Sequence, residues 1–146
     1  MEYKVGSIGR VIVARFDDGE DFLGSLRDLV TQEQIRAGWF HILGGLRHAD
    51  AVSGPKEPVM PPDPVWQTVD GAREVLGAGS IFWDGAKPKF HLHSALGHHG
   101  ETLLGCVRRN TSVYLILEVC ILEITGFTAT RPFWDKGGFN RLTFQK

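Results

Sequence analysis

The histidines and cysteines of the chain are concentrated between Lys89 and Cys106, in the stretch KFHLHSALGHHGETLLGC. This stretch holds four of the six histidines and one of the two cysteines. Imidazole nitrogen and thiolate sulfur are ligands that zinc binds readily in proteins. The composition of the stretch therefore makes it the first candidate for a metal site.

The spacing of these residues predicts which of them can meet one ion. His91 and His93 are separated by one residue, so on a strand both side chains lie on the same face, about 7 Å apart along the chain. A two-residue turn that pairs Gly97 with Gly100 would place Cys106 opposite His91, on that same face. A turn one residue longer would move Cys106 to the other face. The two histidines and the cysteine then form a zinc-ligand set with an open fourth position for water or a small ligand.

The same residues also have a structural interpretation. Pairs of histidines one residue apart are common at protein surfaces, and Cys106 and Cys120 fit small core positions as well as they fit ligand positions. His98 and His99 belong to the expected turn, where solvent would surround them. The spacing alone leaves both interpretations open.

Composition restricts the classes of protein that need to be considered. The 146 residues fit one domain, residues 1–146, and 42% hydrophobic with 23% charged residues is typical of a soluble globular protein. No apolar run approaches the roughly 18 residues of a membrane span, so we expect no membrane and a cytoplasmic location. A net charge of −1 argues against nonspecific electrostatic binding of nucleic acid over a broad surface.

The sequence predicts an α/β domain of the α+β type, in which a mainly antiparallel sheet carries one principal flanking helix. Apolar residues at helical spacing predict the helix within residues 17–39, and Gly38 is the expected C-terminal stop. Those apolar residues are Phe22, Leu23, Leu26, Leu29 and Val30.

Strands are expected on either side of a proline-rich loop. The pair Gly44 and Gly45 predicts a bulge in the second strand, and five of the seven prolines predict a loop over residues 55–64. The first strand, residues 9–16, is apolar on both faces and should be covered on both. The expected strands are 9–16, 39–52, 68–83, 89–97, 101–107, 112–127 and 139–144.

Blocks in this order resemble the PPC domain, the plant and prokaryote domain that follows AT-hooks in plant nuclear proteins. They are RFDDGEDFLGSLRDLV, GWFHILGGLRHADAV, PKFHLHSALGHHGETLLGCV, LEVCILEITGF and FNRLTF, and they cover nearly the whole chain. The resemblance implies a homotrimer and, in stand-alone members, a zinc ion held by three histidines near the subunit interface. The first two are matched by His91 and His93, and the third falls on Cys106. A cysteine there is a departure, with a zinc–sulfur bond of about 2.3 Å in place of about 2.0 Å.

Two charged residues are candidates for catalytic or orienting roles beside the metal. Arg47 falls in a block where the resemblance implies an arginine, and its alternative role is a structural ion pair. Glu118 interrupts the run VYLILEVCIL, which is apolar on both strand faces, so its carboxylate needs a partner. Arg47 or a metal-bound water would serve as that partner.

Three classes of function follow from these observations. The first is a zinc-binding enzyme or sensor that takes an unknown small-molecule ligand at the metal. The second is a trimeric module that acts through protein contacts. The third is DNA binding, which the resemblance suggests but which the slightly negative charge and the missing AT-hook disfavour.

Overall fold

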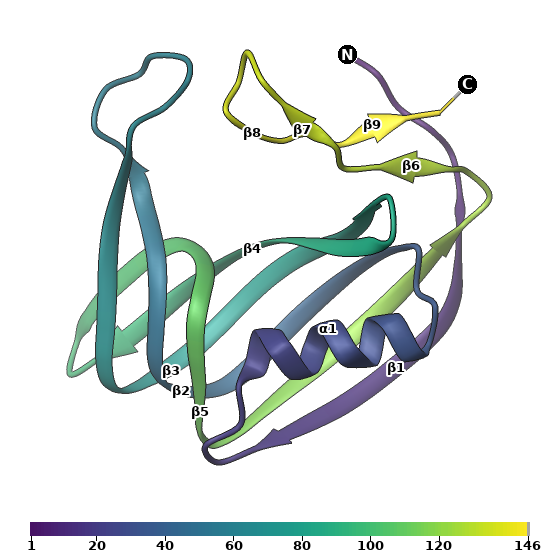
Figure 1. Cartoon of the computed structure of the whole chain (residues 1–146). Coiled ribbons are helices and arrows are strands. Elements are labelled where there is room, and N and C mark those ends of the chain that lie inside the picture. The colour runs from purple at the N-terminus through teal and green to yellow at the C-terminus, as the bar shows by residue number, and fades with distance from the viewer. Residues whose placement is uncertain (146) are drawn as a thin grey trace.

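Five long strands make up most of the chain, in a computed structural model that describes residues 1–145 (Figure 1). They form a strongly bent antiparallel sheet with one helix on its inner side, which confirms the predicted fold class. The long elements are β1 (Ser7–Asp17), α1 (Phe22–Gln32), β2 (Ala37–Pro55), β3 (Pro64–Asp84), β4 (Lys87–His98) and β5 (Glu101–Thr125). The short strands are β6 (Ala129–Thr130), β7 (Phe133–Trp134), β8 (Phe139–Asn140) and β9 (Thr143–Phe144).

The sheet bends where β5 exchanges one neighbouring strand for another. The second half of β5 lies between β1 and the first half of β2, whereas its first half lies between β4 and the second half of β2. The pairing of β2 with β5 shifts register between Gly44 and Leu46, which confirms the predicted bulge. A side chain at Gly44 would meet the carbonyl of Ile116, so glycine permits this close crossing.

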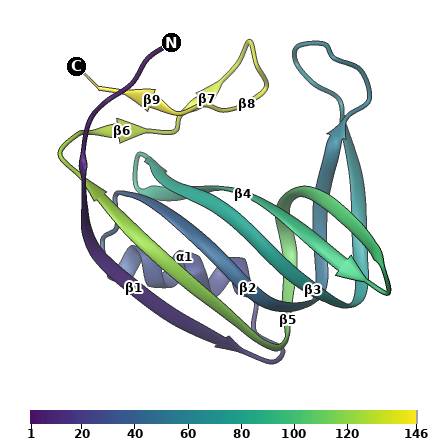
Figure 2. The same cartoon turned by 180° about the vertical axis from the view of Figure 1, so that it is seen from behind.

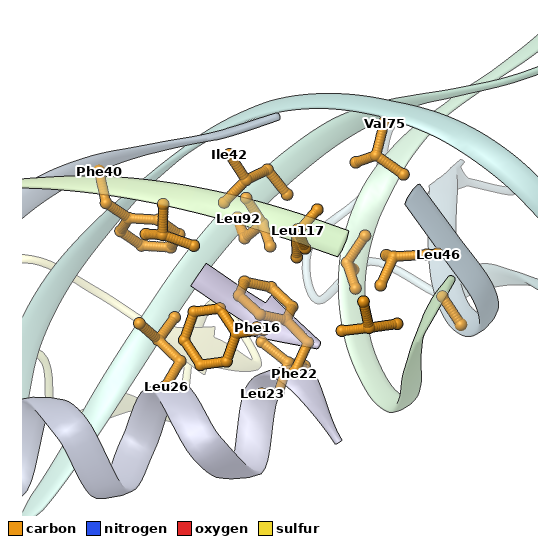
Figure 3. Close-up of a cluster of buried hydrophobic side chains, with 14 of the residues drawn as sticks. Phe16, Phe22, Leu23, Leu26, Phe40, Ile42, Leu46, Val75, Leu92 and Leu117 are labelled. Carbon is orange, nitrogen blue, oxygen red and sulfur yellow. The ribbon is translucent and has the colours of Figure 1, made fainter. Parts of the chain in front are cut away.

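Helix α1 buries its apolar stripe against the inner face of the sheet (Figure 3). Its buried residues Phe22, Leu23, Leu26 and Val30 are four of the five predicted from the helical spacing. The predicted stop at Gly38 is wrong: the helix ends at Gln32, and Gln34 turns the chain with a φ of 55°. Gly38 instead lies in β2.

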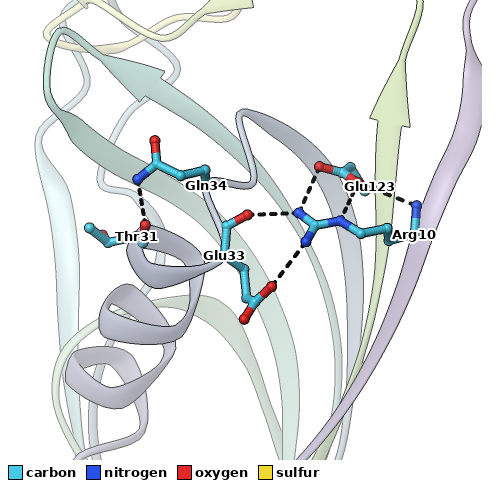
Figure 4. Close-up of polar contacts among 5 residues, drawn as sticks. All are labelled: Arg10, Thr31, Glu33, Gln34 and Glu123. Carbon is cyan, nitrogen blue, oxygen red and sulfur yellow. Dashed lines mark hydrogen bonds and ion pairs between the residues drawn. The ribbon is translucent and has the colours of Figure 1, made fainter.

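A polar contact ties the end of the helix to the sheet (Figure 4). The guanidinium of Arg10 on β1 donates to Glu123 on β5 at 2.9 Å and to the carboxylate of Glu33 at 2.9 Å. It also donates to the main-chain carbonyl of Glu33 at 2.7 Å. The hydrogen bond from Arg10 lowers the pKa of Glu123 below its ordinary value. These contacts are exposed, so they orient the helix more than they stabilise the fold.

Figure 2 looks onto the face of the sheet opposite α1, which we name the outer face. This face carries exposed apolar side chains. Val11 and Val13 of β1 are 57% and 76% exposed there, so within the isolated chain β1 is covered on one face only. Strand pairing places the exposed apolar side chains of neighbouring strands on this same face. They are Val11, Val13, Trp39, Leu43, Leu76, Leu104 and Ile116.

Two irregular segments flank the long strands. Residues 56–63 connect β2 to β3 and contain no helix or strand, which confirms the predicted proline-rich loop. The C-terminal strands β6 to β9 lie along one end of the sheet, where Ala129 packs with Ala37 and Phe82 in a second small core (Figure 1). This segment carries Arg131 onto the sheet.

The buried carboxylate of Asp50 cross-links the strands next to Cys106. Asp50 of β2 accepts hydrogen bonds from Thr68 at 2.9 Å, Asn110 at 2.7 Å and Arg109 at 3.1 Å. Asp50 is 8% exposed, and these donors, with Thr68 first, lower the pKa of its carboxyl. The network joins β2, β3 and β5 two residues from the pair that Val52 forms with Cys106.

We expect Asp50→Asn to lower the melting temperature by several degrees, because an amide cannot accept all three hydrogen bonds. The folded pKa of Asp50 is depressed, so its contribution is present above the unfolded value of about 3.9 and is lost as pH falls through the folded value. The difference in melting temperature between wild type and Asp50→Asn should therefore shrink below about pH 4. Asp70→Asn, at a carboxylate whose side chain is 91% exposed, is the control. Equal stability of the two variants at pH 7 would contradict the prediction.

Candidate metal centre

The hairpin of β4 and β5 brings the predicted ligands together. Its two-residue turn is His99–Gly100, with φ values of 50° and 87°, and it places His93 opposite Cys106. The predicted register, with His91 opposite Cys106, is wrong by two residues. Because side chains alternate with a period of two, a shift of two residues leaves the cysteine on the predicted face.

The three side chains form a compact group of donor atoms. The Nε2 atoms of His91 and His93 are 3.0 Å apart, and one ligand atom from each of the three residues lies within 4.8 Å of the others. Tetrahedral zinc with bonds of about 2.0 and 2.3 Å needs its ligand atoms about 3.3–3.6 Å apart. The donor types therefore suit zinc, and small side-chain rotations would bring the three atoms from their present separations to the required ones. The spacing of the two Nε2 atoms equally suits a hydrogen bond between the rings in the metal-free chain.

The surroundings of the group favour a neutral, metal-ready His91. Although the ring is exposed, its partial desolvation lowers the pKa of His91, and the nearby charges of Arg131, His93 and Arg108 lower it further. A metal binds neutral imidazole, so a lowered pKa reduces competition from protons.

Arg131 is a residue of this site that the sequence does not identify. Its side chain comes from the segment after β6, is 5% exposed, and donates to Ser80 Oγ at 2.8 Å. Ser80 of β3 is paired directly with His91 of β4, so the guanidinium lies beside the metal group. Burial lowers the pKa of Arg131, and the neighbouring Cys106 acts in the opposite direction.

A cavity of about 300 Å³ opens on the other side of the group. His93, Cys106 and Arg108 lie in its wall, together with Pro55 and Pro64 at the two ends of the proline-rich loop. Two of the three candidate ligands therefore border a space large enough for a small molecule. The third ligand, His91, lies toward Ser80 and Arg131.

The two candidate catalytic residues lie elsewhere in the isolated chain. Arg47 forms an ion pair with Asp18, and its guanidinium lies 5.7 Å from the ring of Tyr114, so the structural alternative describes its contacts. Glu118 is exposed, so the expectation that its carboxylate is buried is wrong. Three strand spacings, about 14 Å along the sheet, separate Glu118 from the strand that carries His93.

The remaining histidines stay outside the group. His98 and His99 are exposed at the turn, as predicted. His41 shares the outer face with His93, but β3 separates them, and His48 lies 3.8 Å from Asp70. Among residues 1–145, His91, His93 and Cys106 are therefore the one group of histidine, cysteine or acidic side chains close enough together to bind a single ion.

One protein-family profile matches most of the chain. The profile of the Plants and Prokaryotes Conserved (PCC) domain matches residues 3–125, from β1 to the end of β5. The match includes all three candidate ligands and ends before Arg131. No curated protein matches the sequence. In the described part of the chain, no helix has the length and apolar character needed to cross a membrane.

Solved structures with the same fold are similar along their whole length. A metal-containing protein from Archaeoglobus fulgidus is 21% identical with a TM-score of 0.84, and the match covers all of both chains. A plant- and prokaryote-conserved (PPC) protein from Pyrococcus horikoshii is 18% identical with a TM-score of 0.81, covering 100% of this chain and 98% of the other. A candidate DNA-binding protein from Bacteroides thetaiotaomicron is 14% identical with a TM-score of 0.77, covering 98% and 100%. At these identities the likeness shows the fold.

Proposed function

Because the chain belongs to the Plants and Prokaryotes Conserved domain family, the PPC domain of the sequence analysis, we propose that it is a homotrimeric zinc protein with a small-molecule ligand at the metal. The observation that carries the proposal is the convergence of His91, His93 and Cys106 within 4.8 Å on an exposed face. The resemblance to a metal-containing protein of the same fold supports it.

Each residue of the group has a defined task in this proposal. His91 and His93 hold the ion through neutral Nε2 atoms, and Cys106 holds it as a thiolate. Zinc with three protein ligands supplies Lewis acidity at its fourth position. The cavity beside His93 and Cys106 admits the ligand. We place the protein in the cytoplasm, because a free thiolate ligand is retained most readily in a reducing compartment.

The position of the group connects the metal to assembly. Strand pairing places His93 and Cys106 on the outer face, in the row that runs through His41 and Cys120 to Val13. A trimer that covers the apolar outer face would therefore bring the neighbouring chain close to the metal. Any role of Glu118 or Arg47 at the metal requires this arrangement, because neither reaches the group within one chain.

Assembly through protein contacts is also the alternative function, because the exposed outer face suits a binding module even without chemistry at the metal. Nucleic-acid binding has less support. Arg10, Arg15, Arg47 and Lys56 each pair with an acidic side chain, and the net charge is −1. The chain as a whole therefore carries no excess of positive charge with which to neutralise phosphates.

Elemental analysis tests the proposal directly. The protein is purified without an affinity-tag metal column, and its zinc content is measured by mass spectrometry of the elements. We expect about one zinc ion per chain, because the three ligands come from one hairpin. A preparation that contains no transition metal and takes up none on dialysis against zinc would overturn the proposal.

A further inference from the structure

The guanidinium of Arg131 is buried without an acidic partner. It donates to Ser80 and lies 5.2 Å from the ring of Phe82, but no carboxylate of residues 1–145 pairs with it. Its Nε and Nη1 atoms are buried and have no hydrogen-bond partner in the same residues. Native proteins pair nearly all buried charges, because an uncompensated charge is costly. An unpaired arginine that is 5% exposed therefore indicates a missing anion.

The charge of the proposed metal centre increases this need. A zinc ion with two neutral histidines and one thiolate carries a net charge of +1. Arg131 lies beside this centre, next to Ser80 and His91, and Arg108 borders the cavity on its other side. Three positive charges would then surround the three ligands, with Arg131 on one side and Arg108 on the other. The negative charge that balances them must come from outside this group, because the group contains no carboxylate.

Arginine also restricts the kind of anion. Its planar guanidinium presents parallel N–H groups that match the two oxygens of a carboxylate or phosphate. In Arg131, Nη2 donates to Ser80, and the unpaired Nε and Nη1 lie on the two different edges that they share with Nη2, so each is free to donate to an anion oxygen separately. The same oxygens are suitable ligands for zinc at its open position.

Resting on the function proposed above, we propose that the ligand of the metal centre is a small oxyanion, a carboxylate or a phosphate, whose charge is neutralised by the buried guanidinium of Arg131. Arg131 is a binding residue in this arrangement, and Arg108 adds positive charge at the mouth of the cavity. The ligand is the counter-ion that the isolated chain lacks.

Thermal unfolding with and without added anion tests this inference. Wild type is compared in chloride, acetate and inorganic phosphate at equal ionic strength, once metal-free and once loaded with one equivalent of zinc. At about ten times the dissociation constant, a bound anion should raise the melting temperature of wild type by about 3–5 °C. The acetate and phosphate series show which oxyanion the site prefers. No rise with either anion would overturn the inference.

Three variants assign the effect to Arg131. Arg131→Met should abolish the rise, and Arg131→Lys, which keeps the charge but loses the planar guanidinium with its several donors, should reduce it. Arg27→Met, at an exposed arginine of α1 on the other side of the sheet, should respond like wild type. If Arg131→Met does not fold, the test rests on Arg131→Lys, whose melting temperature should rise less than that of wild type when the anion is added. Equal responses of wild type and every folded Arg131 variant would overturn the inference and leave a carboxylate of another copy as the counter-ion.

Zinc content measured on the same samples separates this inference from the proposed function. Wild type that binds zinc but shows no response to either anion contradicts the oxyanion alone. Wild type that binds no zinc contradicts the metal proposal, and a response of the metal-free protein that depends on Arg131 would still support the anion site.

Discussion

We expect His91→Ala to lose most of the zinc that the wild-type protein binds, and His99→Ala to keep the wild-type zinc content. His91 contributes one of three donor atoms within 4.8 Å, and His99 lies in the exposed turn at the end of the same hairpin. Loss of a residue that only orients a ligand already costs about 10–100-fold in metal affinity. Loss of a ligand itself should cost at least about 100-fold. Competition with a colorimetric chelator measures the affinity of each variant.

Cys106 gives the same experiment a second comparison. Cys106→Ala should lose zinc as His91→Ala does, while Cys106→His should retain it, because the resemblance implies a histidine at this position and imidazole binds zinc at about 2.0 Å. Circular dichroism establishes that each variant is folded before its zinc is measured. Equal zinc content in the His91→Ala and His99→Ala variants would refute the ligand assignment.

The convergence of His91, His93 and Cys106 on one face could be predicted, because it depends on strand periodicity more than on the exact register between β4 and β5. His91 and His93 share a face in any strand, and Cys106 reaches that face in every register with an even shift. The turn was placed one residue too early, because Gly97 and Gly100 were expected to pair across it, and this moved the pairing register by two residues. In the structure His99 and Gly100 adopt the positive φ values of the turn, and Gly97 remains in β4.

The surroundings of the group could not be predicted, because they depend on segments distant in the sequence. Arg131 follows Cys106 by 25 residues and reaches the site only because β6 pairs with Trp83 at the end of β3. Glu118 looked buried because its neighbours in the sequence are apolar on both sides. Those neighbours include Ile116, which is 45% exposed on the outer face, so an apolar sequence here does not indicate burial within one chain.

The extent of the outer face leads to the last prediction. A folded monomer of this mass is expected to expose about 7,500 Å². This chain, of 16.2 kDa, exposes 8787 Å². The excess is comparable to the surface that a stable interface removes from solvent. We therefore expect light scattering coupled to size exclusion to give three times the chain mass, with the number three implied by the family resemblance.

A charge at the centre of the outer face should break this assembly. Leu76 is 65% exposed, pairs with Leu43 on one side and Ala95 on the other, and does not contribute to the core. Leu76→Glu would bury three carboxylates in a closed trimer, at a cost of several kcal/mol for each unpaired charge. It should therefore elute as a folded monomer of 16.2 kDa.

Val59→Glu is the matched control for this variant. Val59 is 61% exposed in the proline-rich loop, outside the outer face, so the same added charge should leave the trimer intact. Circular dichroism separates dissociation from unfolding, since Leu76→Glu should retain the wild-type spectrum. If the outer face is the interface that lies beside the metal, the monomeric variant should also bind zinc more weakly although its three ligands are unchanged. A wild-type protein that is already a stable monomer would refute the assembly and remove the neighbouring chain from the site.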